Sequence, residues 1–188
     1  WFIESCKKIS YLFPRAHAVA YVMMAFRIAW FKVYHPLAFY AAYFSIRAKA
    51  FDLRIMTGDL KTQLTEFNRI KALDRAASPK DKDLMSALEV SMEMYQRGYR
   101  FINVDIQHSE ARRFSIKDGA LLPPFLAIDS LGETVADAIV EERNERPFTS
   151  LKDLQRRCKV SNTIIDLMKD LKCCGELPED EQMSLFGA

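Results

Sequence analysis

The feature that most constrains this sequence is a long stretch near its N-terminal end, residues 16–46, that is apolar and rich in aromatic side chains. Fourteen of the 22 aromatic residues lie in residues 1–51. Apolar positions cover nearly the whole circumference of a helix here, and such a helix is buried inside a larger protein or a membrane. Two cations and the His35-Pro36 pair interrupt the stretch before it reaches the roughly 20 apolar residues that a bilayer requires. We therefore predict a helix buried against further protein, and no membrane.

Prolines predict where the first helices begin and end. Pro14 can occupy the first position of a helix, because its missing N–H would be unpaired there. That helix is expected to end near Tyr34, since the residue before a proline avoids the α region. Pro36 then begins a second helix that extends to about Ala48. The chain starts with Trp1 rather than Met, so we expect a fragment or a processed product.

The middle of the chain has the pattern of two scaffold helices. Apolar residues repeat at helical spacing from Leu60 onwards. Ser78-Pro79 then provides an N-cap and a first-turn proline for a second helix, which ends at Gly98. Both helices have charges of both signs on their outer faces and no chemical motif, so we interpret them as structural.

From residue 101 the pattern changes. Residues 101–106 and 113–116 favour strands, and Asp118-Gly119 is typical of a tight turn. A second helical segment is expected from about Ala127. The sequence therefore predicts a mainly α fold with one small β-hairpin. The predicted divisions are a helical domain over residues 1–120 that ends in the short β segment, a domain of paired helical hairpins over 121–176, and a flexible tail over 177–188.

The N-terminal region also has a large excess of positive charge and contains a candidate anion site. Residues 1–50 contain seven basic residues and one acidic residue. If Pro14 begins the helix, Arg15 and His17 lie in its first turn, where a cation opposes the positive end of the helix dipole. An anion site needs this combination of free N–H groups, guanidinium and imidazole. Tyr21, one turn further on the same face, could stack on a sugar or base. The alternative is that His17 and Tyr21 pack in an aromatic core.

Residues 127–140 predict a helix–hairpin–helix motif. An apolar segment is followed by a short turn that ends at Gly132 and by a helix with the small Ala136 on its packing face. In such a motif the hairpin and the next helix present backbone N–H groups to a nucleic-acid phosphate. The candidate residues are Leu131, Gly132, Glu133 and Thr134. A second helical pair follows at residues 151–155 and 160–171, with Ser161 or Asn162 as an N-cap. The alternative is an ordinary helical hairpin, which the net charge of −4 over residues 101–150 favours.

The C-terminal segment has the form of a docking peptide on a linker. Residues 177–188 are polar and acidic and include a proline, so they cannot form a core and should be flexible. Apolar side chains nevertheless return at the end, as an amide donor followed by apolar anchors. These candidate residues are Gln182, Met183, Ser184, Leu185 and Phe186. The alternative is a tail that folds back on its own domain.

Other kinds of chemistry have no signature in the sequence. The three histidines form no HxxxH pair, and there is no Walker loop or GxSxG elbow. The pair Asp81 and Asp83 has the spacing of metal-binding carboxylates but lies at a polar helix start. The four cysteines form no CxxC pair, which indicates ordinary thiols in a reduced, cytoplasmic chain. We expect no metal site and no catalytic carboxylate in this segment.

In this order, the three motifs resemble the bacterial C-family replicative DNA polymerases, specifically the PolC type of DNA polymerase III alpha subunit. Residues 1–42, with the run from Phe13 to Tyr21 and the His35-Pro36 turn, are similar to the fingers domain of that family. Residues 127–143 are similar to its tandem helix–hairpin–helix region. Residues 182–186 resemble its clamp-binding pentapeptide, with Met183 in place of the usual leucine.

The resemblance implies a role for each motif. The fingers would hold the incoming dNTP with Phe13, Arg15, His17 and Tyr21. The hairpins would hold duplex DNA, and the tail would bind a sliding clamp. Nucleotidyl transfer would use Mg²⁺ on palm carboxylates in the remainder of the polymerase chain. The competing interpretation is a non-enzymatic adaptor that binds DNA and the clamp.

Overall fold

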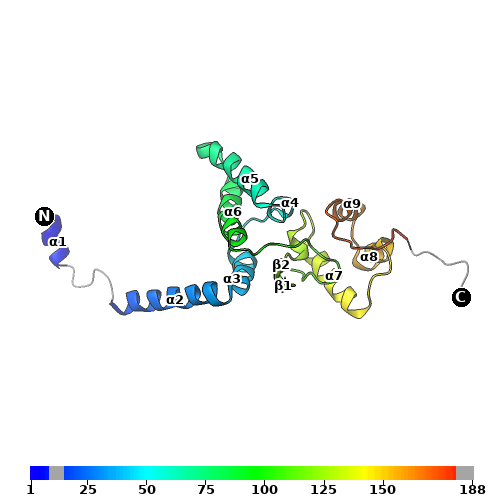
Figure 1. Cartoon of the computed structure of the whole chain (residues 1–188), viewed down its shortest axis with the longest axis horizontal. Helices are drawn as coiled ribbons and strands as arrows, with labels where there is room; N and C mark the ends of the chain where they lie inside the picture. Colours follow the sequence, from blue (N-terminus) through cyan, green and yellow to red (C-terminus); the bar gives the residue numbers. More distant parts are fainter. Residues whose placement is uncertain (9–14, 181–188) are drawn as a thin grey trace, which may run out of the picture. The chain divides into compact units, whose positions relative to one another are not determined.

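The computed structural model describes residues 1–8 and 15–180, and the chain divides into two compact units, Trp1–Phe39 and Tyr40–Ala188 (Figure 1). The described part is mainly helical, with a single two-stranded sheet. Both features agree with the predicted fold class. The boundary expected near residue 120 lies inside the second unit, and the three-part division stays a prediction.

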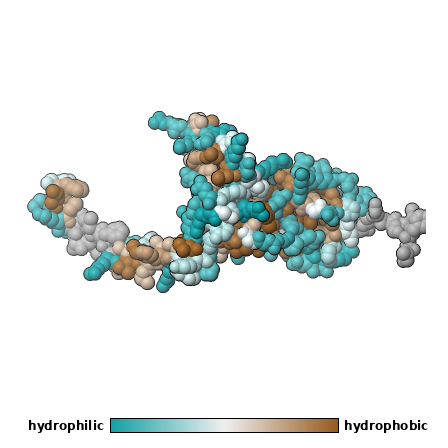
Figure 2. Space-filling view, in the orientation of Figure 1, coloured by the Kyte–Doolittle hydropathy of each residue, from teal (hydrophilic) through white to brown (hydrophobic). Residues whose placement is uncertain are grey.

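The first unit contains α1 (Phe2–Lys8) and α2 (Arg15–Tyr34), and α3 (Pro36–Ala42) crosses into the second. The predicted end of the first long helix at Tyr34 is confirmed, as is the start of the next helix at Pro36. No residue of α2 is buried, and much of its surface in Figure 2 is hydrophobic.

By length and composition alone, α2 could cross a membrane. The helix extends for 20 residues, although Arg27 and Lys32 lie within it. A helix that is buried inside a soluble protein meets the same criterion. The length and composition of α2 therefore fit either a bilayer or a protein partner, and the absence of a membrane stays a prediction.

After α3 the chain widens into one π-helical turn, η1 (Tyr43–Arg47). Together α3 and η1 cover nearly all of the predicted second helix. Phe44 points into a cluster of aromatic rings and meets the Phe101 ring edge-on, with 4.9 Å between the ring centroids. Phe51 and Phe114 complete this cluster. The backbone N–H of Phe114 also donates to the Ser45 hydroxyl at 2.9 Å, which fixes the turn against the β segment.

The scaffold helices pack around one buried amide. The elements are α4 (Leu53–Met56), α5 (Leu60–Leu73), the short 3-10 turn η2 (Asp74–Ala76) and α6 (Pro79–Gln96). Gln63 of α5 is fully buried and donates to the Met56 carbonyl at 3.1 Å. Its other end accepts from the Ser91 hydroxyl of α6 at 2.6 Å. The amide therefore joins α4, α5 and α6, because a buried polar group must find partners.

The predicted N-terminus of α6 is confirmed in detail. The Ser78 side chain accepts from the Asp81 N–H, and the Asp81 carboxylate accepts from the Ser78 N–H, which makes a capping box. Pro79 occupies the first helical position. The helix ends at Gln96, and Gly98 follows with a φ of +85°.

The β segment is smaller than predicted. Strands β1 (Ser115–Lys117) and β2 (Ala120–Leu122) pair antiparallel through the predicted turn, in which Asp118 and Gly119 both have positive φ. The strand expected at residues 101–106 is wrong, since only Phe101 forms a bridge, to Leu121.

The cause of that error is local hydrogen bonding by polar side chains. The Asn103 side-chain oxygen accepts from the Val104 N–H at 2.9 Å, and Asp105 accepts from the Gln107 N–H at 2.8 Å. Side chains that satisfy neighbouring backbone groups favour turns over strands. The apolar residues of this segment are instead used in the core, where Val104 and Ile106 are buried.

The C-terminal half of the second unit contains the main core. Its elements are the 3-10 turn η3 (Phe125–Ala127), α7 (Glu133–Glu145), α8 (Leu151–Cys158) and α9 (Asn162–Asp170). The fully buried side chains of this core include Phe125, Ile128, Ile139, Leu154 and Met168. The helix expected from about Ala127 is present only as η3 before the hairpin, and the full helix begins at Glu133. The second helical pair is confirmed, with Ser161 as its N-cap.

The beginning of the expected tail is attached to α8. The Leu151 and Lys152 N–H groups donate to the carbonyls of Pro178 and Glu179, at 2.9 Å and 3.2 Å. Leu177 packs against the core. The expectation of a flexible linker from residue 177 is therefore corrected for residues 177–180, because they satisfy the free N–H groups of α8. The remaining tail residues, 181–188, lie outside the described part.

Candidate nucleic-acid interface

Two short hairpins in the second unit have the same construction. The first, residues 130–132, precedes α7, and the second, residues 159–161, precedes α9. Each begins with a non-glycine residue in the left-handed region, Ser130 with a φ of 64° and Lys159 with a φ of 54°. In each hairpin a buried aliphatic residue follows, and the third position is the N-cap of the next helix.

The buried aliphatic residue explains why each hairpin holds its shape. Leu131 is 5% exposed and Val160 is 3% exposed, and both belong to the same core. Burying an aliphatic side chain stabilises the fold by about 1.5–3 kcal/mol, which is enough to offset the left-handed residue before it. The Leu131 side chain is therefore unavailable to a ligand, and its N–H donates to the Ile128 carbonyl. Of the predicted DNA-binding residues, Gly132, Glu133 and Thr134 remain exposed.

After each hairpin a helix begins with backbone donors that point outward. The first N–H groups of a helix have no acceptor within the helix. Across the described residues, no acceptor is present for the N–H groups of Glu133 and Thr134, or of Asn162 and Thr163. These four residues are exposed. Each hairpin therefore offers a pair of N–H donors at the positive end of a helix dipole, which suits a phosphate oxygen.

The first hairpin has acidic surroundings that Arg112 partly neutralises. The Arg112 guanidinium contacts Glu133 at 2.5 Å and also forms a close ion pair with Asp137. Its hydrogen bond holds the pKa of Asp137 below the usual range. Asp129 and Glu141 add further negative charge on this side of the unit. A phosphate approaching the N–H groups of α7 would meet these carboxylates.

The second hairpin, in contrast, has a basic residue at its start and fewer acidic residues near its exposed N–H groups. Lys159 is exposed at its start, and the polar Asn162 and Thr163 follow. The Asn162 side chain is held by a close hydrogen bond from Gln155 of α8. Asp166 is the nearest acidic residue along α9, one turn beyond the exposed N–H groups. The second hairpin is therefore the better of the two for an anion.

A buried carboxylate fixes the connection between α7 and α8. The Asp153 side chain is fully buried and accepts hydrogen bonds from Arg156 at 2.8 Å and Arg157 at 3.2 Å. Arg157 also reaches Glu142 of α7 at 2.9 Å. Burial raises the pKa of Asp153, but the hydrogen bonds from Arg156, the Thr149 N–H and Arg157 outweigh burial and lower the pKa below its ordinary value. This ionic network joins the end of α7 to α8.

A cavity of about 310 Å³ opens beside the first hairpin. Its lining includes Phe51 and Phe114 of the aromatic cluster and residues 127–131. Lys49 and Arg112 also line it. Aromatic faces next to cations are typical of surfaces that accept nucleic-acid bases and phosphates together.

The predicted nucleotide-binding residues lie in the first unit. Arg15, His17 and Tyr21 are exposed on α2. The structure brings two of them together, since the His17 and Tyr21 rings lie 4.4 Å apart between centroids and are tilted by 59°. Phe13 lies outside the described residues. The role of all four in nucleotide binding stays a prediction.

Two other predictions remain untested. The candidate clamp-binding residues, Gln182 to Phe186, lie outside the described residues. Within residues 1–8 and 15–180, no group of three or more His, Cys, Asp or Glu side chains is placed to hold a metal ion. The expectation that Mg²⁺ ligands lie elsewhere in a parent chain is not tested by this observation.

The residues that sequence reasoning missed are those of the second hairpin. Its helices and N-cap were predicted, but Lys159, Asn162 and Thr163 were not identified as candidate ligand contacts. A signal was present in the sequence: Ser130-Leu131-Gly132 and Lys159-Val160-Ser161 share the order polar, aliphatic, small. Arg112 was also missed, because its ion pairs link residues more than 20 positions apart.

Comparison with known families agrees with this geometry. The family described as "Helix-hairpin-helix motif" matches residues 98–182, which include both hairpins.

Similar whole proteins are DNA polymerases. The chain is 48% identical over 186 residues to "DNA polymerase III PolC-type" of Caldanaerobacter subterraneus subsp. tengcongensis. It is 48% identical over 188 residues to the protein of the same name from Streptococcus suis, and 47% identical over 189 residues to that of Streptococcus pyogenes serotype M12. Each match covers 99% of this chain and 13% of the relative, so the chain spans about an eighth of their length.

Proposed function

From the premise that this chain belongs to the PolC-type DNA polymerase III family, we propose that it serves a replicative DNA polymerase in three ways. It holds duplex DNA through the two hairpins, positions the incoming dNTP through α2, and docks on a sliding clamp through its tail. The polymerase would act in the cytoplasm. The relatives are named as DNA polymerases, which favours this function over a non-enzymatic adaptor.

The observation that carries the duplex-binding role is the pair of matching hairpins with exposed N–H groups. Backbone donors at a helix N-terminus contact phosphate without reading the base sequence. A replicative polymerase must hold every sequence equally, so contacts of this kind suit its task. Two hairpins in one rigid core would hold two phosphates at a fixed separation.

Of the two hairpins, we assign the stronger contact to the second. Its Lys159 and its Asn162 and Thr163 N–H groups offer charge and donors together. Around the first hairpin, Glu133 and Asp137 compete with a phosphate for Arg112. The first hairpin would therefore contribute mainly through shape and through the neighbouring cavity.

The dNTP-positioning role is supported by the His17 and Tyr21 pair and by the family. Phe13, Arg15, His17 and Tyr21 would bind the triphosphate and the base, and Arg15 suits a phosphate because its planar fork can make two hydrogen bonds. Mg²⁺, where bound, would neutralise the charge that develops on the phosphates. Its carboxylate ligands would lie in the remainder of the polymerase chain, which would also cover the exposed apolar surface of α2.

Clamp docking would use the five residues from Gln182 to Phe186. An amide followed by two apolar anchors, Leu185 and Phe186, fits a shallow apolar groove on a partner. Deleting residues 182–186 from the full-length polymerase should abolish its capture by the clamp. Unchanged capture would place the docking site elsewhere.

A proline substitution tests the duplex-binding role at a single N–H group. Asn162 is the first residue of α9, where proline is tolerated, and Ser161 before it has an extended backbone (φ −71°, ψ 155°) that proline requires. Asn162→Pro in the full-length polymerase therefore removes the N–H and keeps the fold. Asn162→Ala is the matched control, because it removes the same side chain and retains the N–H.

We expect Asn162→Pro to weaken duplex affinity about tenfold relative to Asn162→Ala, since one hydrogen bond to a charged group contributes about 1.5 kcal/mol. The corresponding pair at the first hairpin, Glu133→Pro and Glu133→Ala, should differ less. Equal affinity for Asn162→Pro and Asn162→Ala would exclude this N–H group as a phosphate contact.

A further inference from the structure

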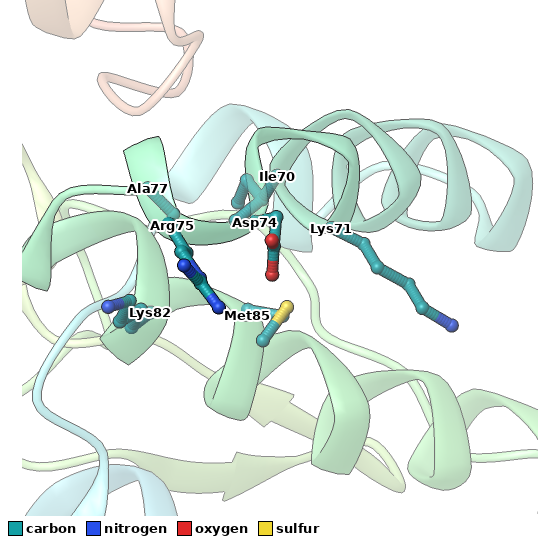
Figure 3. A pocket seen from close by; sticks show the side chains of 7 residues that line it. All are labelled: Ile70, Lys71, Asp74, Arg75, Ala77, Lys82 and Met85. Atoms are coloured by element: carbon teal, nitrogen blue, oxygen red, sulfur yellow. The ribbon is translucent and has the colours of Figure 1, made fainter.

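A second cavity, of about 370 Å³, lies between the end of α5 and the beginning of α6, where η2 joins them (Figure 3). Lys71, Arg75 and Lys82 line it together with one acidic residue, Asp74. Ile70 and Met85 provide apolar lining. In Figure 3 the side chains of Arg75 and Met85 extend into the same space, whereas Lys71 extends away from it.

Of the carboxylates near this cavity, that of Asp81 is already engaged, so Asp74 is the one lining acid that opposes the three lining cations. The Asp81 carboxylate accepts from the Ser78 N–H and hydroxyl, and it also lies 3.6 Å from Arg69. Over the described ranges, neither Arg75 nor Lys82 has a carboxylate within ion-pair distance. The cavity therefore has an excess of positive charge that the second unit does not neutralise.

The position of Lys82 opposes the stability of its own helix. Lys80 and Lys82 lie in the first turn and a half of α6, close to the positive end of the helix dipole. Cations there are unfavourable because the positive end of the dipole repels them. The capping box already satisfies the helix end, so these lysines do not serve the helix. An anion that enters the cavity would relieve the repulsion between Arg75, Lys82 and the dipole.

We propose that this cavity binds a backbone phosphate of single-stranded DNA. The proposal rests on the proposed function, since it is the polymerase family that brings DNA to this unit. A single strand fits better than a duplex, because a flexible backbone can enter a recess that a stiff double helix would bridge. Arg75 and Lys82 contact the phosphate oxygens, while the half-buried Met85 contacts the sugar.

The test uses the full-length polymerase and a thymidine oligonucleotide, with affinity measured across a range of salt concentrations. The salt slope is the slope of the logarithm of the binding constant against the logarithm of the salt concentration. Each phosphate contact that is lost should reduce its magnitude for a single strand by about 0.7. Arg75→Ala and Lys82→Ala should each show this reduction together with weaker binding. Lys61→Ala is the matched control: it removes one exposed charge from the opposite end of α5, outside the cavity lining, and should keep the wild-type slope.

Two competitors identify the class of anion. Pyrophosphate and a polyglutamate peptide are each tested for displacement of the oligonucleotide from wild-type protein and from Arg75→Ala. Weak displacement by either supports a strand-binding cavity. Tight, Arg75-dependent binding of the peptide, or of pyrophosphate alone, would overturn the proposal.

The same measurements also distinguish a failure of the cavity proposal from a failure of the hairpin assignment. Asn162→Pro weakens duplex binding under the proposed function and should leave the salt slope for the single strand unchanged. If Asn162→Pro weakens duplex binding while Arg75→Ala and Lys82→Ala behave like Lys61→Ala, the cavity proposal alone is wrong. If Asn162→Pro has no effect on the duplex while Arg75→Ala lowers the single-strand slope, the hairpin assignment alone is wrong.

Discussion

At the scale of single residues, Lys159 has two separate roles. Its backbone has a φ of 54°, a conformation that costs a non-glycine residue roughly 1 kcal/mol. Its side chain is the exposed cation of the second hairpin. Glycine is the residue usually found at this position after a helix, because it adopts this conformation without strain.

Lys159→Gly separates the two roles. Removing the left-handed strain should increase the protection of α8 and α9 amides against hydrogen exchange, by roughly 0.5 kcal/mol in the free energy of opening. Removing the charge should reduce the salt slope of duplex binding by about 0.9. A variant with higher protection and an unchanged slope would show that Lys159 does not contact DNA.

The cysteines give a second prediction at this scale. Burial raises the pKa of the Cys173 thiol to about 12, and those of Cys158 and Cys174 to about 11. At a pH of about 8 these thiols stay protonated, and only thiolates react with alkylating reagents. Native protein should therefore be alkylated at the half-buried Cys6 and not at the other three, whereas unfolded protein should react at all four. Rapid native labelling of Cys173, read by mass spectrometry, would contradict its buried position.

At the scale of elements, the helices could be predicted from the sequence better than the strands. Ser78-Pro79 and Ser161 mark helix starts because capping is a local interaction between neighbouring residues. The segment 101–106 was mistaken for a strand, since Asn103 and Asp105 bond their own backbone. Of the two candidate hairpins, only the first could be identified from the sequence. The preference for the second depends on the charges around the first, where Arg112 is paired with Asp137 and Glu133, which are distant in the sequence.

The buried Asp153 carboxylate allows a prediction of how the stability of the α7–α8 pair depends on pH. Asp153→Asn leaves Arg157, which is 11% exposed, without its buried anion, and breaking such a pair costs about 3 kcal/mol. The pKa of Asp153 is below its ordinary value in the folded state, so its stabilisation is present above a pH of roughly 4 and is lost as the pH falls through the folded pKa. Thermal unfolding should show this acid dependence in wild-type protein and a weaker one in Asp153→Asn. Identical pH profiles would exclude the network as a source of stability.

At the scale of the whole molecule, the two units differ in how complete they are. The second unit has its own core, whereas α2 in the first has no buried residue and exposes Phe26, Trp30 and Phe31. The all-round apolar pattern predicted a buried helix, whereas α2 has no residue buried against the described part of the chain. The chain spans about 13% of the length of each of these relatives.

Truncation tests this difference. A chain of residues 40–188 should be monomeric by light scattering after size-exclusion chromatography, because its apolar groups are in its core. The 188-residue chain should self-associate through the exposed side chains of α2. A monomeric 188-residue chain would show that α2 needs no further protein to cover it.

The assignment of the two hairpins as the duplex-binding site is tested by removing an N–H group from both of them. The measurement is the affinity of the full-length polymerase for a primer–template duplex. The variant Glu133→Pro with Asn162→Pro is compared with Glu133→Ala and Asn162→Ala, which keeps both donors. We expect the double-proline variant to bind more than tenfold more weakly, because the Asn162 N–H contributes about 1.5 kcal/mol and the Glu133 N–H adds a smaller amount. Equal affinity of the two double variants would contradict the assignment of these hairpins as the duplex-binding site.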